Sequence, residues 1–64
     1  MNDLDRERVI QAAIRVSGRR DAAKEWLTMP QKSFNYKTPL QLIEEGRAAD
    51  LIRYLASFES GFVG

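Results

Sequence analysis

Apolar residues recur every three to four positions in four separate stretches of this chain, the spacing that places them on one face of an α-helix. Nowhere do they alternate with polar residues over a sustained run, and no Asn-Gly or Asp-Gly hairpin turn occurs. The pattern therefore predicts an all-α fold, a compact bundle of four helices in which the middle two are short.

The first stretch predicts a helix from Asn2 to Gly18. Either Asn2 or Asp3 is suited to cap its first turn, and Arg15 near its end complements the helix dipole. Its apolar positions fall on one stripe, because several are four residues apart. The stripe consists of Val9, Ile10, Ala12, Ala13, Ile14 and Val16.

The second stretch predicts a short helix over residues 22–28, with Asp21 as its N-cap. Pro30 ends it, because proline disfavours the helical conformation of the residue before it. Trp26 and Leu27 share a face with the alanines of this helix. Trp26 is the only tryptophan, and we expect it in the core; the alternative is an exposed binding anchor.

Residues 28–37 form the one irregular segment of the prediction. Asn35 is the residue best suited to a left-handed turn position. We expect Phe34 to cover the core beneath this loop and Tyr36 to lie at the surface. Two lysines and two aromatic residues in ten positions are too few to favour base stacking on single-stranded nucleic acid.

The third stretch, Thr38 to Gly46, has signals for both ends of a short helix. Thr38 is a good N-cap, Pro39 suits the first helical position, and Gln41 lies at the capping-box spacing. Gly46 is placed to enter the left-handed region and end the helix. The core face is predicted to be Leu40 and Ile43, with Leu42 flanking them.

The last helix is predicted from Arg47 to Ser60, and the tail from Gly61 to Gly64 follows it. Phe62 in this tail has two interpretations: it folds back onto the last helical turn, as in a Schellman motif, or it inserts into a partner together with Val63. The apolar stripe of the helix is Ala48, Leu51, Ile52, Leu55 and Phe58, with Tyr54 at its margin.

Composition narrows the range of functions. The chain has 64 residues, no cysteine and no histidine, so we expect one small domain without disulfides or zinc. It lacks a nucleophile–base pair and a glycine-rich phosphate loop, so we expect no catalysis and no cofactor. A net charge of +1 with interspersed signs gives no electrostatic case for nucleic acid. No apolar run is long enough to span a membrane, and the composition fits a cytoplasmic protein.

An ordered set of residues after the first helix resembles the toxin-binding domain of the Xre/MbcA/ParS-like type II antitoxins. The resemblance covers about forty residues. The chain departs from the family at Tyr36, where family members usually carry glycine before the basic-Thr-Pro sequence, so the loop conformation is not carried over. The matching residues are Ala22, Ala23, Trp26, Leu27, Pro30, Thr38, Pro39, Leu40, Leu42, Ile43, Gly46, Arg47, Leu51, Tyr54, Leu55 and Gly61.

This resemblance implies a helical module that binds and neutralises a RES-domain toxin, an enzyme that consumes NAD. In the family the C-terminal end of the antitoxin commonly approaches the active site of the toxin. The candidate toxin-binding residues are therefore Glu59, Ser60, Gly61, Phe62, Val63 and Gly64, together with Arg47. The candidate structural residues are Trp26, Leu27, Thr38, Pro39, Leu40, Ile43, Gly46, Leu51 and Leu55.

Many relatives also carry an N-terminal helix-turn-helix domain. We expect residues 1–64 to be a single toxin-binding domain without it, either as a stand-alone protein or as a fragment of a longer antitoxin. One alternative is a DNA-linked regulator or plasmid-partition protein, in which a homodimer gathers a basic surface. Another is a helical oligomerisation module. The basic surface would combine Arg15, Arg19, Arg20 and Lys24.

Overall fold

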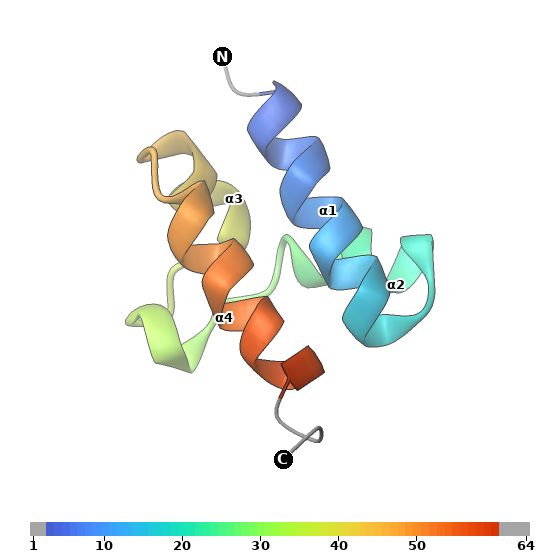
Figure 1. The fold of residues 1–64 in the computed structure, drawn as a ribbon. Helices are drawn as coiled ribbons and strands as arrows, with labels where there is room; N and C mark the ends of the chain where they lie inside the picture. Colours follow the sequence, from blue (N-terminus) through green and yellow to red (C-terminus); the bar gives the residue numbers. More distant parts are fainter. Residues whose placement is uncertain (1–2, 61–64) are drawn as a thin grey trace.

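The computed structural model describes residues 3–60, which form four α-helices and one short 3₁₀ helix and contain no β-strand. The predicted all-α class is confirmed. The helices are α1 (Asp3–Ser17), α2 (Arg20–Trp26), α3 (Pro39–Glu44) and α4 (Ala48–Ser60), and the 3₁₀ helix is Lys32–Phe34. The two long helices, α1 and α4, lie side by side, with α2 and α3 packed around them (Figure 1).

The core is formed by the faces that α1 and α4 turn toward each other. Among residues 3–59 no polar or charged side chain is buried, so the core is held together by apolar packing. Val9 of α1, Leu42 of α3 and Leu51 of α4 are fully inaccessible to solvent. The other buried apolar residues are Ile10, Ala12, Ala13, Ala23, Leu27, Pro39, Ile43, Ala48 and Leu55.

The corner around α3 has the predicted local structure. The Thr38 hydroxyl accepts a hydrogen bond from the Gln41 amide at 3.2 Å, and the Thr38 amide donates to the Gln41 side chain at 2.8 Å. This is a complete capping box with Pro39 in the first turn. Gly46 has a φ of +80°, the left-handed conformation expected at the end of the helix. The capping prediction is confirmed.

The core face of α3 differs from the prediction. Leu42 was expected to flank the core, yet it is fully buried, whereas Leu40 is only partly buried. α3 packs against both α1 and α4. A helix packed on two sides buries a wider arc than its apolar spacing alone indicates, and that arc includes Pro39, Leu42 and Ile43.

The start of α2 also differs from the prediction. The helix begins at Arg20, and Arg19 is the N-cap residue, without a capping side-chain hydrogen bond. Asp21 therefore lies in the first turn, where its negative charge still complements the helix dipole. The helix ends at Trp26, and tight turns bring the Thr28 amide to the Glu25 carbonyl and the Met29 amide to the Trp26 carbonyl. It is displaced by about two residues from the predicted range.

The loop between α2 and α3 contains a 3₁₀ helix that the sequence did not predict. Asn35 follows it with a φ of +58°, which confirms the expected left-handed position. Tyr36 also has a positive φ, +64°, and its side chain is 65% exposed. The left-handed region is unfavourable for a residue with a Cβ atom. Tyr36 therefore adopts, at a conformational cost, a backbone geometry that glycine would adopt easily.

Candidate functional site

The end of α4 carries the first of the candidate toxin-binding residues. The carboxylate of Glu59 lies 3.3 Å from Nε of Arg15, so an ion pair joins the last turn of α4 to the last turns of α1. The Arg15 side chain is 60% exposed and that of Glu59 37%, and an ion pair near the surface contributes about 0–1 kcal/mol. Ser60 is the last residue of α4. The C-terminal tail, Gly61–Gly64, lies outside the described residues.

Two apolar side chains next to this ion pair are exposed, contrary to the prediction. Phe58 is 53% exposed and Val16 is 43% exposed, although both were assigned to core-facing stripes. The stripes are correct up to Ala13 on α1 and Leu55 on α4, which are buried. Val16 and Phe58 lie in the last turns of α1 and α4, beside a hollow that the side chains of α1, α2 and α4 do not fill, so the same periodicity no longer corresponds to burial.

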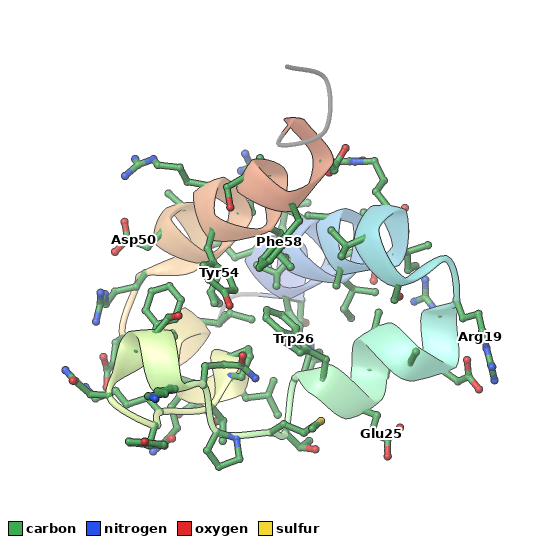
Figure 2. All side chains as sticks on the ribbon, turned by 90° about the horizontal axis from the view of Figure 1, so that it is seen from below. Arg19, Glu25, Trp26, Asp50, Tyr54 and Phe58 are labelled. Atoms are coloured by element: carbon green, nitrogen blue, oxygen red, sulfur yellow. The ribbon has the colours of Figure 1, made fainter. Side chains whose placement is uncertain are left out.

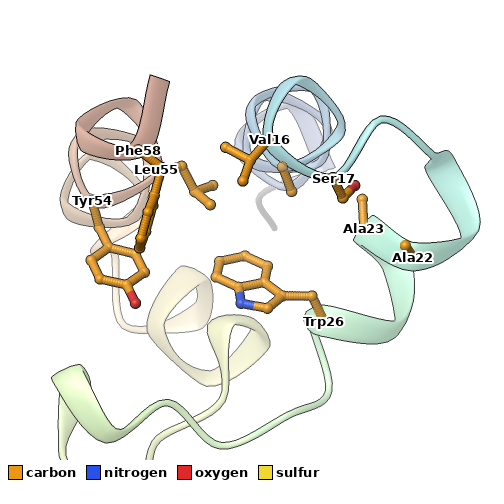
Figure 3. A pocket seen from close by; sticks show the side chains of 9 residues that line it. Val16, Ser17, Ala22, Ala23, Trp26, Tyr54, Leu55 and Phe58 are labelled. Carbon is orange, nitrogen blue, oxygen red and sulfur yellow. The ribbon is translucent and has the colours of Figure 1, made fainter. Parts of the chain in front are cut away.

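Val16 and Phe58 border an apolar hollow of about 310 Å³ between α1, α2 and α4, which we call the groove (Figure 3). Trp26 reaches from α2 toward the α4 side of the groove. Its ring is half-buried and packs against the core, so the expected core residue lies at the margin of the core. The groove is lined by Ala13, Val16, Ser17, Ala22, Ala23, Trp26, Tyr54, Leu55 and Phe58.

Three aromatic rings follow one another along the side of α4. The ring centroids of Phe34 and Tyr54 are 5.4 Å apart, and those of Tyr54 and Phe58 are 5.1 Å apart. Both pairs have the edge-to-face geometry that aromatic quadrupoles favour, and Figure 2 shows Tyr54 beside Phe58. Phe34 packs against the core, as expected, but remains partly exposed. This aromatic row was missed in the sequence. Its only signal was the four-residue spacing of Tyr54 and Phe58.

Arg47 lies at the opposite end of α4 from Glu59. Because α4 has thirteen residues, the helix separates them by about 18–20 Å. The guanidinium of Arg47 lies 3.1 Å from an Asp50 carboxylate oxygen and 5.6 Å from the centre of the Phe34 ring. The structure therefore does not bring Arg47 together with the other candidate binding residues, and the contacts it makes stabilise the start of α4.

The basic residues proposed as a DNA-contacting surface are largely paired with carboxylates. Arg15 pairs with Glu59, Arg19 with Asp21 at 2.8 Å, and Arg20 with Glu7 at 3.4 Å. Each pair balances a positive charge locally. Among residues 3–60 these arginines therefore form no continuous unneutralised patch of the kind that phosphate binding uses.

Two of these carboxylates have altered acidity. The Glu7 carboxylate accepts a hydrogen bond from the Gln11 side chain at 3.0 Å and faces Arg20, and both contacts lower the pKa of Glu7. The Arg19 guanidinium donates to both carboxylate oxygens of Asp21, which lowers the pKa of Asp21. Both are exposed groups, and their shifts favour the charged form, as expected for surface ion pairs.

The chemistry available in the described region is that of a binding surface. Residues 3–60 contain no cluster of acidic side chains able to hold a metal ion. Among them, no helix combines the length and hydropathy required to cross a bilayer. The groove has an almost entirely apolar lining with the Ser17 hydroxyl at one edge. This arrangement can bury apolar side chains of another segment.

Comparison with known proteins identifies the family. Residues 11–61 match the antitoxin Xre/MbcA/ParS C-terminal toxin-binding domain. No curated protein and no solved structure gave a significant match. The family match spans most of the chain and includes α2, α3, α4 and the second half of α1. The chain therefore belongs to the family of antitoxin Xre/MbcA/ParS C-terminal toxin-binding domains.

Proposed function

We propose that this chain is the toxin-binding module of a type II antitoxin, and that it neutralises a RES-domain, NAD-consuming toxin by steric occlusion. In this proposal residues 1–64 act as one domain. The helical body docks on the toxin, and the C-terminal tail enters the NAD cleft. Family membership supports a toxin as the partner. The identity of the toxin follows from the resemblance described above.

The observation that carries the occlusion mechanism is the fixed position of the end of α4. Leu51 and Leu55 anchor α4 in the core, and the Glu59–Arg15 ion pair joins its last turn to α1. The tail therefore begins at a defined point of a folded body. A tail attached in this way loses less entropy on binding than a free peptide, because the helix that precedes it is already part of a folded body.

The composition of the tail also supports the mechanism. Phe62 and Val63 supply two large apolar side chains within four residues. Aromatic residues are frequent anchors of binding interfaces. The glycines on either side allow the close backbone approach that a narrow cleft requires.

The test compares three chains in neutralisation of a purified RES-domain toxin, with NAD consumption as the readout. These are the full chain, a chain lacking Gly61–Gly64, and a full-length Phe62→Ser/Val63→Ser variant that keeps the length of the tail. Both altered chains should keep the helical circular dichroism spectrum and neutralise the toxin less effectively. Full neutralisation by the shortened chain would show that the tail does not occlude the active site.

A pull-down from the native host tests the partner independently of the mechanism. A RES-domain protein should co-purify with the chain. A co-purifying toxin of another enzyme class would contradict the RES assignment, and the antitoxin assignment would stand.

A further inference from the structure

We infer that the groove is the docking site of the chain's own C-terminal tail in the free protein, with Phe62 inserted between Val16, Trp26 and Phe58. The inference concerns the free chain. It does not depend on the identity of the toxin, and its test contains no toxin.

The position of the tail is the first argument. The groove is bordered by Phe58, two residues before the end of α4 at Ser60. Two helical residues correspond to about 3 Å along the axis. An extended chain spans at most about 3.3–3.6 Å per residue, so the Cα atom of Phe62 lies within about 7 Å of that of Ser60. The groove is therefore within reach of the Phe62 side chain.

The alternative fold-back onto the last turn offers Phe62 little to pack against. In a Schellman motif with Gly61 at C′, the apolar residue after the glycine contacts the C3 or C4 position, which here are Ser57 and Ala56. Both are exposed and small, and the Ser57 hydroxyl donates to the Tyr54 carbonyl at 2.6 Å. The groove instead offers the faces of Trp26 and Phe58.

The size of the groove favours a short segment over a helix or a second copy. Its volume of about 310 Å³ lies at the lower end of the range for small-ligand pockets, roughly 300–1,000 Å³. That is room for one or two side chains. The exposed large apolar residues at the groove are Val16 and Phe58, since Leu4, Met29 and Tyr36 lie elsewhere. A stable dimer needs about 800 Å² per partner, which this patch does not provide.

The electrostatics of the rim agree with an apolar, uncharged occupant. The charged pair nearest Phe58 and Val16, Arg15–Glu59, is already neutralised internally. Phe62 and Val63 carry no charge. Docking the tail therefore buries apolar surface without separating any of the ion pairs described above.

Trp26 provides the readout for the test, because it lines the groove and is the chain's only tryptophan. In the full chain, nuclear Overhauser effects should connect the Phe62 ring to the Trp26 indole and the Val16 methyl groups. In Phe62→Ala, the emission of Trp26 should shift to longer wavelength and its quenching by acrylamide should rise. Circular dichroism should show unchanged helix content.

Val16→Lys tests the same contact by changing the groove instead of the tail. Lysine is a better helix former than valine and its charge is favourable near a helix C-terminus. Val16 is also 43% exposed, so the fold should tolerate the substitution. The substitution should reproduce the Phe62→Ala spectrum, and the double variant should show no additional shift. Leu4→Lys is the matched control, because Leu4 is an exposed residue of α1 outside the groove; it should leave the Trp26 signal unchanged.

Absent Phe62–Trp26 contacts, or additive effects of Val16→Lys and Phe62→Ala, would overturn the inference. A Trp26 signal that depends on protein concentration would overturn it too, because a second copy would then fill the groove. Each of these three results would leave the toxin-neutralising proposal standing. If both proposals hold, the tail has to leave the groove before it enters a toxin. The apparent affinity for the toxin is then reduced in proportion to the fraction of chains whose tail is free.

Discussion

The corner from Thr38 to Gly46 and the C-terminal half of α4 are specified in different ways. At the corner, adjacent residues determine the structure through the Thr38–Gln41 capping box and the left-handed Gly46. At the end of α4, the local sequence specifies a helix just as clearly, but it does not determine what Phe58 contacts, and half of that ring is exposed. The caps at both ends of α3 lie within these nine residues. The end of α4 presents apolar surface that only another segment can cover.

The largest expected effect lies at the centre of the corner. Leu42→Ala removes a fully buried side chain and should lower the free energy of unfolding by about 2–5 kcal/mol. A core of this size rarely supplies more than about 3–5 kcal/mol, so the variant should be largely unfolded. Urea titration followed by circular dichroism measures this. Leu4→Ala, at a 73% exposed position, is the control and should change little.

Tyr36, in the loop before the corner, has a positive φ, and glycine at this position should relieve the backbone strain. Tyr36→Gly should be more stable than Tyr36→Ala by about 1 kcal/mol, because glycine adopts a positive φ without the Cβ clash. Both variants lose the same exposed phenol ring, so their difference isolates the backbone. Thermal unfolding of the pair measures it. Equal melting temperatures would show that the loop relaxes out of the left-handed region.

The cap of α3 should contribute about 1 kcal/mol. Thr38→Ala removes the acceptor for the Gln41 amide and should destabilise the domain by about that amount. Toxin binding should weaken only in step with stability. A Thr38→Ala protein with unchanged melting but abolished binding would show that α3 itself contacts the partner.

Phe58→Ala should have a smaller effect on stability than any core truncation. Half of the ring is exposed, and its edge-to-face contact with Tyr54 is worth about 0.5–1.5 kcal/mol. Leu55→Ala, one turn earlier and buried, should cost several times more. Equal destabilisation by the two truncations in urea unfolding would show that the end of α4 is packed as tightly as its middle. That result would contradict the proposed difference between the corner and the end of α4.

The smallest effect concerns pH. The pKa of Glu7 is lowered from 4.5 in the folded protein, so its contribution to stability is present above that value and is lost as pH falls toward the folded pKa. Glu7→Gln should lower the melting temperature slightly at neutral pH, and its difference from the native chain should vanish in acid. A difference that persists at low pH would indicate lost packing rather than lost charge.

Local sequence signals predicted the parts of the fold that are determined by contacts between residues close together in the sequence. Thr38, Gln41 and Gly46 could be assigned because caps and left-handed glycines act over three or four residues. The Asp21 cap was wrong, because the helix begins at Arg20, about two residues earlier than the side-chain preference indicates, with Arg19 as its N-cap. The burial of Leu42 was underestimated, because it depends on packing against α1 and α4 and not on the residues next to it.

The site was less predictable for the same reason. Periodicity assigned Val16 and Phe58 to the core. It reports which face of a helix a residue occupies, but it contains no information about whether another part of the chain covers that face. The groove needs α1, α2 and α4 together, and the Arg15–Glu59 pair joins residues 44 positions apart. The resemblance added Arg47 to the candidate binding residues of the tail, although the length of α4 keeps it at the other end of that helix. The tail assignments remain predictions.

The start of α1 has a practical consequence for dissecting longer members of this family. The family match begins at residue 11, but Val9 is fully buried and Ile10 is 4% exposed, and α1 packs on the three other helices. A fragment cut at the first matched residue would remove two core side chains and more than half of the helix that the rest of the domain surrounds. Expression boundaries set by similarity alone would therefore yield an unstable protein, whereas a start before α1 keeps the core whole.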